Sequence, residues 1–342
     1  MPDSYGKHPS VSIIILNYNG REFVERCLKS VLTTDYLNFE VIFIDNASTD
    51  GSLELVEKMF GSDPHLKTIR NDENLGFAEG NNVGARVAKG NYIVFLNNDT
   101  DVNSKWLKEL VEVMESDPTI GIAQSKILLM RDPMKLDCAG GFMDPYGWTN
   151  KRGEREKDVG QYDEVSEIFY AHGATMAVKR EILEKVGIFD PKFFIYYDDL
   201  DLCWRVWLCG YKVVFVPKSV VYHEAGAWGR AQPRPQMTSF FCKNHTSALL
   251  KNYSLHNLVR TLPVYIALVH GMAMYLMLKG EVKGALAYFK AILWNLLNLR
   301  HVWTERLKVQ YLIRKIPDDK LFEKGIILQK PLFLRMLQEQ SR

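Results

Sequence analysis

The N-terminal half of the chain alternates short, uninterrupted apolar runs with stretches of apolar residues at helical spacing. The run at 11–16 is followed by Phe23, Cys27 and Val31, which share one helical face. Strands that are apolar on both faces are typical of parallel sheets covered by helices on both sides. The pattern predicts strands at 11–16, 39–44, 66–69, 92–96 and 213–216, and helices at 22–32, 52–60, 77–88, 180–186 and 199–209.

Polar residues cluster where these predicted strands end. Asn17 and Asn19 follow the first strand, Asp45 follows the second, and residues 97–99 follow the fourth. In open α/β sheets, ligands bind at the carboxyl ends of the strands. The expected fold is therefore a Rossmann-like, mostly parallel sheet flanked by helices, with a ligand site at this edge.

The composition is that of a globular protein. Hydrophobic residues make up 47% and charged residues 25% of 342 positions, which excludes disordered, collagen-like and small disulfide-rich chains. The five cysteines are scattered and show no zinc-like spacing, and residues 1–10 contain no apolar signal segment. These features favour a reduced, cytoplasmic chain.

Charge is distributed unevenly along the chain. Residues 243–342 carry a formal charge of +10 and residues 1–242 one of −8. We therefore predict two regions, a ligand-binding catalytic domain at 1–242 and a basic, apolar helical region at 243–342. The acidic first region argues against nucleic acid as a partner.

Two apolar stretches dominate the C-terminal region. Residues 262–278 contain no charged side chain, and residues 285–299 contain only Lys290. The first would span about 26 Å as a helix, slightly less than a hydrocarbon core of about 30 Å. Flanking basic residues favour a helical hairpin lying on an anionic membrane surface. The alternative is a bundle packed on the catalytic domain or on a second subunit, as in a homodimer.

Five segments carry candidate chemistry, and three of them lie in the first hundred or so residues. Asp45 could accept hydrogen bonds from a base or a ribose, whereas Asp50 is better explained as a helix cap. The glycine-rich segment 74–84 could bring the helix start near Phe77 to a diphosphate, although the signal is weak. Asp99, in an acidic loop, is suited to hold Mg²⁺ or Mn²⁺ together with a substrate diphosphate.

The remaining candidates lie further along the chain. Asp198 and Asp199 follow an aromatic run at a helix start, where repulsion and apolar neighbours would raise one pKa toward the value that a general base needs. His223 precedes a glycine-rich, basic loop that could close over phosphates. Taken alone, a single histidine is more often only a packed or exposed side chain.

Read together, these segments resemble the family 2 inverting glycosyltransferases, which have an A-type nucleotide-sugar-binding fold, and in particular their rhamnosyltransferase-like branch. The resemblance covers about residues 10–230, and the order of the motifs is more specific than any one of them. The matching motifs are NYNG at 17–20, DNASTDGS at 45–52, NLGFAEGNNVG at 74–84, LNNDT at 96–100, GA at 173–174, the segment 187–211 and HE at 223–224.

The resemblance implies roles for individual residues. Asp99 and His223 would hold the metal, and Asp199 would be the catalytic base. The motif at 97–99 has one acid where the family has two, and the pair Asp198-Asp199 has a shorter first acid, so which carboxylate is the base stays open. The residues implied to bind the nucleotide sugar are Asn17, Tyr18, Asn19, Asp45, Asn46, Gly76, Asn82, Asn98 and Asp99.

The resemblance also implies a reaction. A sugar would pass with inversion from a nucleoside-diphosphate sugar, dTDP-rhamnose or a UDP-sugar, to a hydroxyl of a glycan or lipid-linked acceptor in cell-surface polysaccharide synthesis. The enzyme would be peripheral to the cytoplasmic face of the membrane. The alternatives are a catalytically weak nucleotide-binding scaffold and a sugar-1-phosphate nucleotidyltransferase, although the latter normally has a basic, glycine-rich loop after its first strand.

Overall fold

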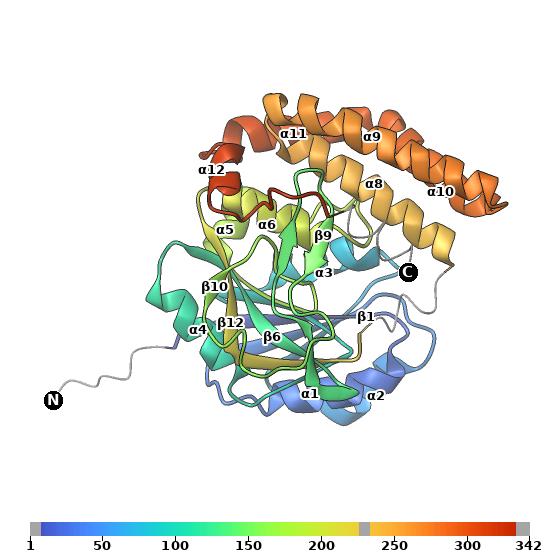
Figure 1. The fold of residues 1–342 in the computed structure, drawn as a ribbon. Helices are drawn as coiled ribbons and strands as arrows, with labels where there is room; N and C mark the ends of the chain where they lie inside the picture. Colours follow the sequence, from blue (N-terminus) through green and yellow to red (C-terminus); the bar gives the residue numbers. More distant parts are fainter. Residues whose placement is uncertain (1–7, 226–232, 333–342) are drawn as a thin grey trace.

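The computed structural model describes residues 8–225 and 233–332, and one large sheet organises this part of the chain (Figure 1). Its strand order is β10-β12-β6-β11-β4-β1-β2-β3, with β5 paired to β12 and β7 to β6. The strands are β1 Val11–Asn17, β2 Phe39–Asp45, β3 Leu66–Arg70, β4 Tyr92–Asn97, β5 Thr100–Val102, β6 Ile120–Leu129, β7 Asp132–Cys138, β10 Ser166–Glu167, β11 Thr175–Lys179 and β12 Lys212–His223, while β8 Gly141–Met143 and β9 Thr149–Lys151 form a separate pair.

Helices cover both faces of the sheet, as the two-sided apolar strands predict. Side chains along β1 alternate between two cores: Ile13 and Ile15 pack on the side of α1, and Ile14 packs on the side of α3. The fold is therefore a mixed α/β architecture with a central sheet flanked by helices on both faces. The helices are α1 Arg21–Leu32, α2 Ser52–Phe60, α3 Gly76–Val87, α4 Trp106–Ser116, α5 Arg180–Val186, α6 Asp198–Leu208, α8 Arg234–Asn252, α9 Leu255–Leu278, α10 Val282–Leu297, α11 Leu299–Leu307, the π-helical turn η1 Lys308–Ile313 and α12 Asp318–Glu323.

The ten predicted elements are present, and nine of them end within one residue of the predicted limits. The exception is the strand predicted at 213–216, which continues as β12 to His223. The chain passes Pro217 through a register irregularity between Val216 and Val220, so a break in the apolar pattern does not end the strand. This continuation brings His223 to the edge where the parallel strands end.

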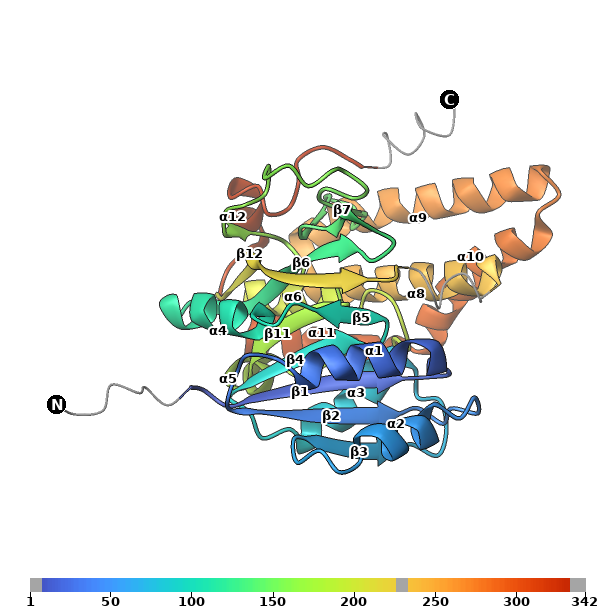
Figure 2. The ribbon, with the colours of Figure 1, turned by 90° about the horizontal axis from the view of Figure 1, so that it is seen from below.

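The C-terminal helices pack on the catalytic part of the chain. Helix α8 lies between the sheet layers and the hairpin formed by α9 and α10, as the two orthogonal views show (Figures 1 and 2). The predicted division between residues 242 and 243 lies inside α8.

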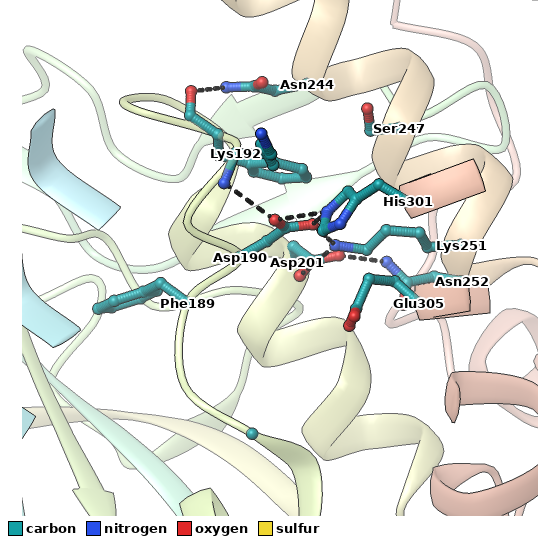
Figure 3. Close-up of polar contacts among 12 residues, drawn as sticks. Phe189, Asp190, Lys192, Asp201, Asn244, Ser247, Lys251, Asn252, His301 and Glu305 are labelled. Carbon is teal, nitrogen blue, oxygen red and sulfur yellow. Dashed lines mark hydrogen bonds and ion pairs between the residues drawn. The ribbon is translucent and has the colours of Figure 1, made fainter. Parts of the chain in front are cut away.

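A buried charge network fastens α8 to α6 (Figure 3). The Lys251 ammonium is 2.7 Å from Asp190 Oδ2 and 3.1 Å from Asp201 Oδ2, and all three side chains are buried. His301 of α11 also contacts Asp190, at 3.0 Å, and Asn252 donates to Asp201 at 2.8 Å. Removing one partner of such a network leaves a buried unpaired charge, which costs about 3–5 kcal/mol. The network therefore ties α8 and α11 to Asp190 and Asp201, which lie before residue 242 in the chain.

Candidate functional site

The carboxyl ends of β1, β2 and β4 meet in one hydrogen-bonded cluster. Parallel register places Asn17 beside Asp45, and both side chains are fully buried. Asn17 Nδ2 lies 3.4 Å from Asp45 Oδ1, and Asn17 Oδ1 accepts from Asn98 Nδ2 at 2.7 Å. Since Asn98 directly precedes Asp99, the cluster connects the second strand end to the predicted metal-binding acid.

Asp99 and His223 face each other across the end of the sheet. Asp99 Oδ1 is 3.3 Å from His223 Nε2, and both residues are nearly buried. His223 Nδ1 is 2.7 Å from Asp137 Oδ2, and Asp137 pairs with Lys151 at 3.1 Å. Burial alone would lower the pKa of His223, but its hydrogen bonds to Asp137 and Asp99 raise that pKa to about 9.

This arrangement fits a divalent cation. A carboxylate oxygen and an imidazole nitrogen lie side by side, and the second ring nitrogen is held by another carboxylate, which is how proteins orient a ligating histidine. Among residues 8–225 and 233–332, no group of three or more His, Cys, Asp or Glu side chains is placed to hold a metal by itself. A cation here would therefore complete its shell with substrate oxygens, as Mg²⁺ and Mn²⁺ commonly do with phosphates.

A cavity of about 420 Å³ joins Asp99 and His223 with the two acids of α6, whereas the predicted nucleotide-binding residues Asn17, Tyr18, Asn19, Asp45 and Asn98 do not line it. Its lining includes Asp99 and His223 at the strand ends, Asp198 and Asp199 at the helix start, and Phe241 of α8. Further lining residues, which sequence reasoning did not single out, are Thr149, Lys151, Tyr170, His172, Tyr196, Tyr197 and Met237.

The environment of the α6 acids suits proton transfer. Asp199 Oδ2 accepts a hydrogen bond from the Gly173 N–H at 3.0 Å, and Oδ1 accepts from the Leu200 N–H at 2.8 Å. Burial raises the pKa of Asp199, and burial together with the charge of Asp199 raises the pKa of Asp198 well above the usual range. The two N–H donors stabilise the ionised form of Asp199, and a carboxyl group with a raised pKa is the kind of group that can accept a proton.

Three predicted nucleotide-binding residues have their side chains or backbone engaged within the protein. Asn82 donates to the Phe189 carbonyl at 3.0 Å and accepts from its N–H at 3.1 Å. Asn46 donates to Asn74 and to the Gly76 carbonyl, and Gly76 has a φ of 77° at a point where a Cβ would lie 2.5 Å from Phe194. None of these three residues lines the cavity, and they hold neighbouring segments in place.

Two further predictions concern helix starts. The N–H groups of Phe77 and Ala78, near the start of α3, donate to the carbonyl of Phe194, and the Gly76 N–H donates to Asn74 Oδ1, so these groups are engaged within the protein. Asp50 accepts from the Ser52 N–H in the first turn of α2 and from the Arg21 N–H, while the N-cap residue of this helix is Gly51. Tyr18 and Asn19 are exposed beside the Asn17 cluster. The glycine-rich, basic loop predicted to close over phosphates begins at Gly226, and residues 226–232 lie outside the described residues.

The chain matches the family model described as glycosyl transferase family 2 over residues 12–187. Glycosyltransferase AglE of Haloferax volcanii is 26% identical over 65% of this chain and 69% of its own length. O-antigen biosynthesis protein RfbC of Myxococcus xanthus is 28% identical over 67% of this chain and 18% of its own length. The chain spans less than two thirds of the length of the first three curated relatives that it matches.

Solved structures show the same fold. GalNAc-T7 with UDP, GalNAc and Mn²⁺ superposes with a TM-score of 0.59 at 22% identity, covering 72% of this chain and 48% of that one. Residues 1–349 of TarS from S. aureus, in complex with UDP-GlcNAc, superpose with a TM-score of 0.57 at 16% identity, covering 94% of both chains.

Proposed function

Since the chain belongs to glycosyl transferase family 2, we propose that it transfers a sugar, with inversion, from a nucleoside-diphosphate sugar to a hydroxyl of a glycan or lipid-linked acceptor. The observation that carries this proposal is the shared cavity, which has the Asp99–His223 pair on one wall and Asp199 on another. An activated donor and an acceptor hydroxyl need these two kinds of group within reach of one sugar.

In the proposed mechanism, the residues at the strand ends bind the donor and Asp199 activates the acceptor. Asp45 and Asn17 would bind the nucleoside, while Asp99 and His223 would hold Mg²⁺ or Mn²⁺. When bound, the cation supplies positive charge that stabilises the departing diphosphate. Asp199 would take the proton from the acceptor hydroxyl, whose oxygen attacks the anomeric carbon from the face opposite the diphosphate. No covalent intermediate with the enzyme is required.

Donor identity is the finer part of the proposal. The rhamnosyltransferase-like resemblance favours dTDP-rhamnose, whereas UDP and UDP-GlcNAc in the two superposed structures favour a uridine donor. The O-antigen relative supports a role in cell-surface polysaccharide synthesis.

A donor panel tests the function. We expect full-length protein with Mn²⁺ to release nucleoside diphosphate from one class among dTDP-, UDP- and GDP-sugars, at a rate that rises with an acceptor glycan. A nucleotide-binding scaffold would bind nucleoside diphosphate in a thermal-shift assay and release none. A nucleotidyltransferase would instead form nucleotide sugar and pyrophosphate from sugar 1-phosphate and nucleoside triphosphate.

We also propose that the α9–α10 hairpin docks on the cytoplasmic face of an anionic membrane. Helix α9 has a mean hydropathy of 1.6 over its most apolar window, 22% of which is buried, and is long enough to cross a membrane. Exposed apolar side chains continue around the hairpin tip, where Lys279 and Lys283 are also exposed. The exposed apolar residues include Met274, Leu278, Val282, Leu286, Leu293 and Leu297.

Vesicle flotation tests this docking. The triple substitution Met274→Ser, Leu278→Ser and Val282→Ser should abolish flotation with vesicles containing phosphatidylserine, because it removes apolar area at the tip. The matched control replaces Leu37, Met134 and Val159 by serine, since these residues are at least as exposed on average but lie elsewhere. Unchanged flotation of the tip variant would refute the proposal. Self-association of the unmodified protein without binding to the vesicles would refute it as well.

A further inference from the structure

The loop that leads into α6 has a backbone that needs outside support. Phe194, Tyr196 and Tyr197 have φ values of 66°, 70° and 65°. Bulky residues rarely adopt this left-handed conformation, and it persists only where surrounding structure imposes it. Tyr197 immediately precedes Asp198 and Asp199, so the loop conformation decides where these carboxylates enter the cavity.

One side chain of α8 supplies much of that support. Asn244 is fully buried, and the two N–H bonds of its Nδ2 group are shared among the carbonyls of Phe193 at 2.9 Å, Ile195 at 2.8 Å and Tyr196 at 2.8 Å. The remaining carbonyl, that of Phe194, accepts from the start of α3. Four successive loop carbonyls are thus held from outside the loop, three of them by one amide (Figure 3 shows Asn244).

The orientation of this amide indicates a specific purpose. Asn244 Oδ1 is buried and has no hydrogen-bond partner within the described part of the chain. A buried polar atom without a partner is costly and calls for an explanation. Here the three carbonyls fix the donor end of the amide against the loop, and the oxygen faces away from it.

Neighbouring residues of α8 contact the same loop. Lys243 Nζ donates to the Lys192 carbonyl at 2.7 Å. Phe240 stacks on Phe194 with ring centroids 5.1 Å apart, and His245 stacks on Tyr197 at 4.8 Å. The charge network around Lys251 keeps this helix fixed against α6, and Figure 3 shows that network beside Asn244.

We propose that Asn244 is a positioning residue for sugar transfer, because its three hydrogen bonds hold the left-handed loop that places Asp199 in the cavity. This inference rests on the proposed function. Asn244 acts through the backbone and does not line the cavity itself. Its loss should therefore impair the chemical step more than donor binding.

The test compares two asparagines of one helix. Asn252 is also fully buried in α8, but its amide bonds to Asp201 and not to the loop. Asn244→Ala should lower kcat about 10²-fold, since a misplacement of 1 Å costs about that much, with little change in the Mn²⁺-dependent Kd for UDP or dTDP. Asn252→Ala leaves the ion pairs of Lys251 with Asp190 and Asp201 in place, so it should leave kcat nearly unchanged even if it lowers thermal stability as much. Equal effects of the two variants on kcat would overturn the proposal.

Hydrogen exchange gives a readout that does not need activity. Amides of residues 192–199 should exchange faster in Asn244→Ala than in Asn252→Ala, and unchanged protection there would also overturn the proposal. If Asn244→Ala does not fold, Lys243→Met takes its place. This substitution removes the hydrogen bond from Lys243 Nζ to the Lys192 carbonyl but keeps an apolar side chain. It should lower kcat and speed hydrogen exchange at residues 192–199, both to a smaller extent. An unmodified protein that transfers no sugar refutes the proposed function, while the exchange result still decides whether Asn244 holds the loop.

Discussion

Asp199→Asn should lower kcat about 10²–10⁴-fold, the contribution that a positioned general base usually makes. Asparagine keeps the shape of the side chain and can still accept from the Gly173 N–H, but it cannot take a proton from an acceptor hydroxyl. The measurement is kcat for transfer alongside the Kd for nucleoside diphosphate, which should stay within a few-fold of the unmodified protein. Near-normal turnover would remove the base assignment.

Asp198→Asn distinguishes the two neighbouring acids. Burial and the charge of Asp199 raise the pKa of Asp198 well above its usual range, which disfavours the ionised form of Asp198. The neutral amide should therefore be tolerated far better at this position than at Asp199. A larger loss in Asp198→Asn would move the role of base to Asp198.

The pH profile provides an independent check. Burial raises the pKa of Asp199, although the N–H groups of Leu200 and Gly173 and the charge of Lys151 oppose this change. A base must be ionised, so kcat/KM should fall as pH decreases through the raised pKa. The acidic limb should lie above the value of about 3.9 for an unperturbed aspartate. The acidic limb should be absent from the pH profile of any residual activity of Asp199→Asn.

Removal of divalent metal should produce the other large effect. EDTA is expected to reduce transfer to background, and Mn²⁺ or Mg²⁺ to restore it, because a cation held by Asp99 and His223 would neutralise charge on the diphosphate leaving group. Asp99→Asn should reproduce the loss at ordinary metal concentrations and be partly rescued by excess Mn²⁺.

Asp101→Asn is the matched control for Asp99→Asn. Asp101 lies two residues further along the same acidic segment, in β5, and does not line the cavity. Its replacement should leave the apparent metal affinity unchanged. Full activity of the unmodified protein in chelator would contradict the metal assignment and leave the Asp99–His223 pair with a structural role.

The part of the site at the strand ends could be predicted because local patterns determine it. Uninterrupted apolar runs define β1 and β2, and once these strands are parallel, the residues that follow them must meet at one edge. The helical pattern after residue 198 similarly predicted that Asp198 and Asp199 lie in the first turn of α6.

The rest of the site depends on contacts between distant segments. Asp137 and Lys151 come from β7 and β9, and nothing in their immediate sequence marks them as neighbours of His223. The Asn82 amide donates a hydrogen bond to the backbone carbonyl of Phe189, which lies more than a hundred positions away in the sequence. The role of α8 was equally hidden, since its hydrogen bonds run to loop carbonyls, which every residue type provides.

The placement of α8 has a consequence for recombining related enzymes. The matched family segment ends at residue 187. Beyond it, Asn244 of α8 donates hydrogen bonds to the loop of 193–197, and Lys251 of α8 is ion-paired to Asp190 and Asp201. Chimeras that exchange the C-terminal helices at residue 243 would separate Asn244 and Lys251 from their partners, and we expect such hybrids to be destabilised. An exchanged segment that starts before Asp190 would keep these partners together.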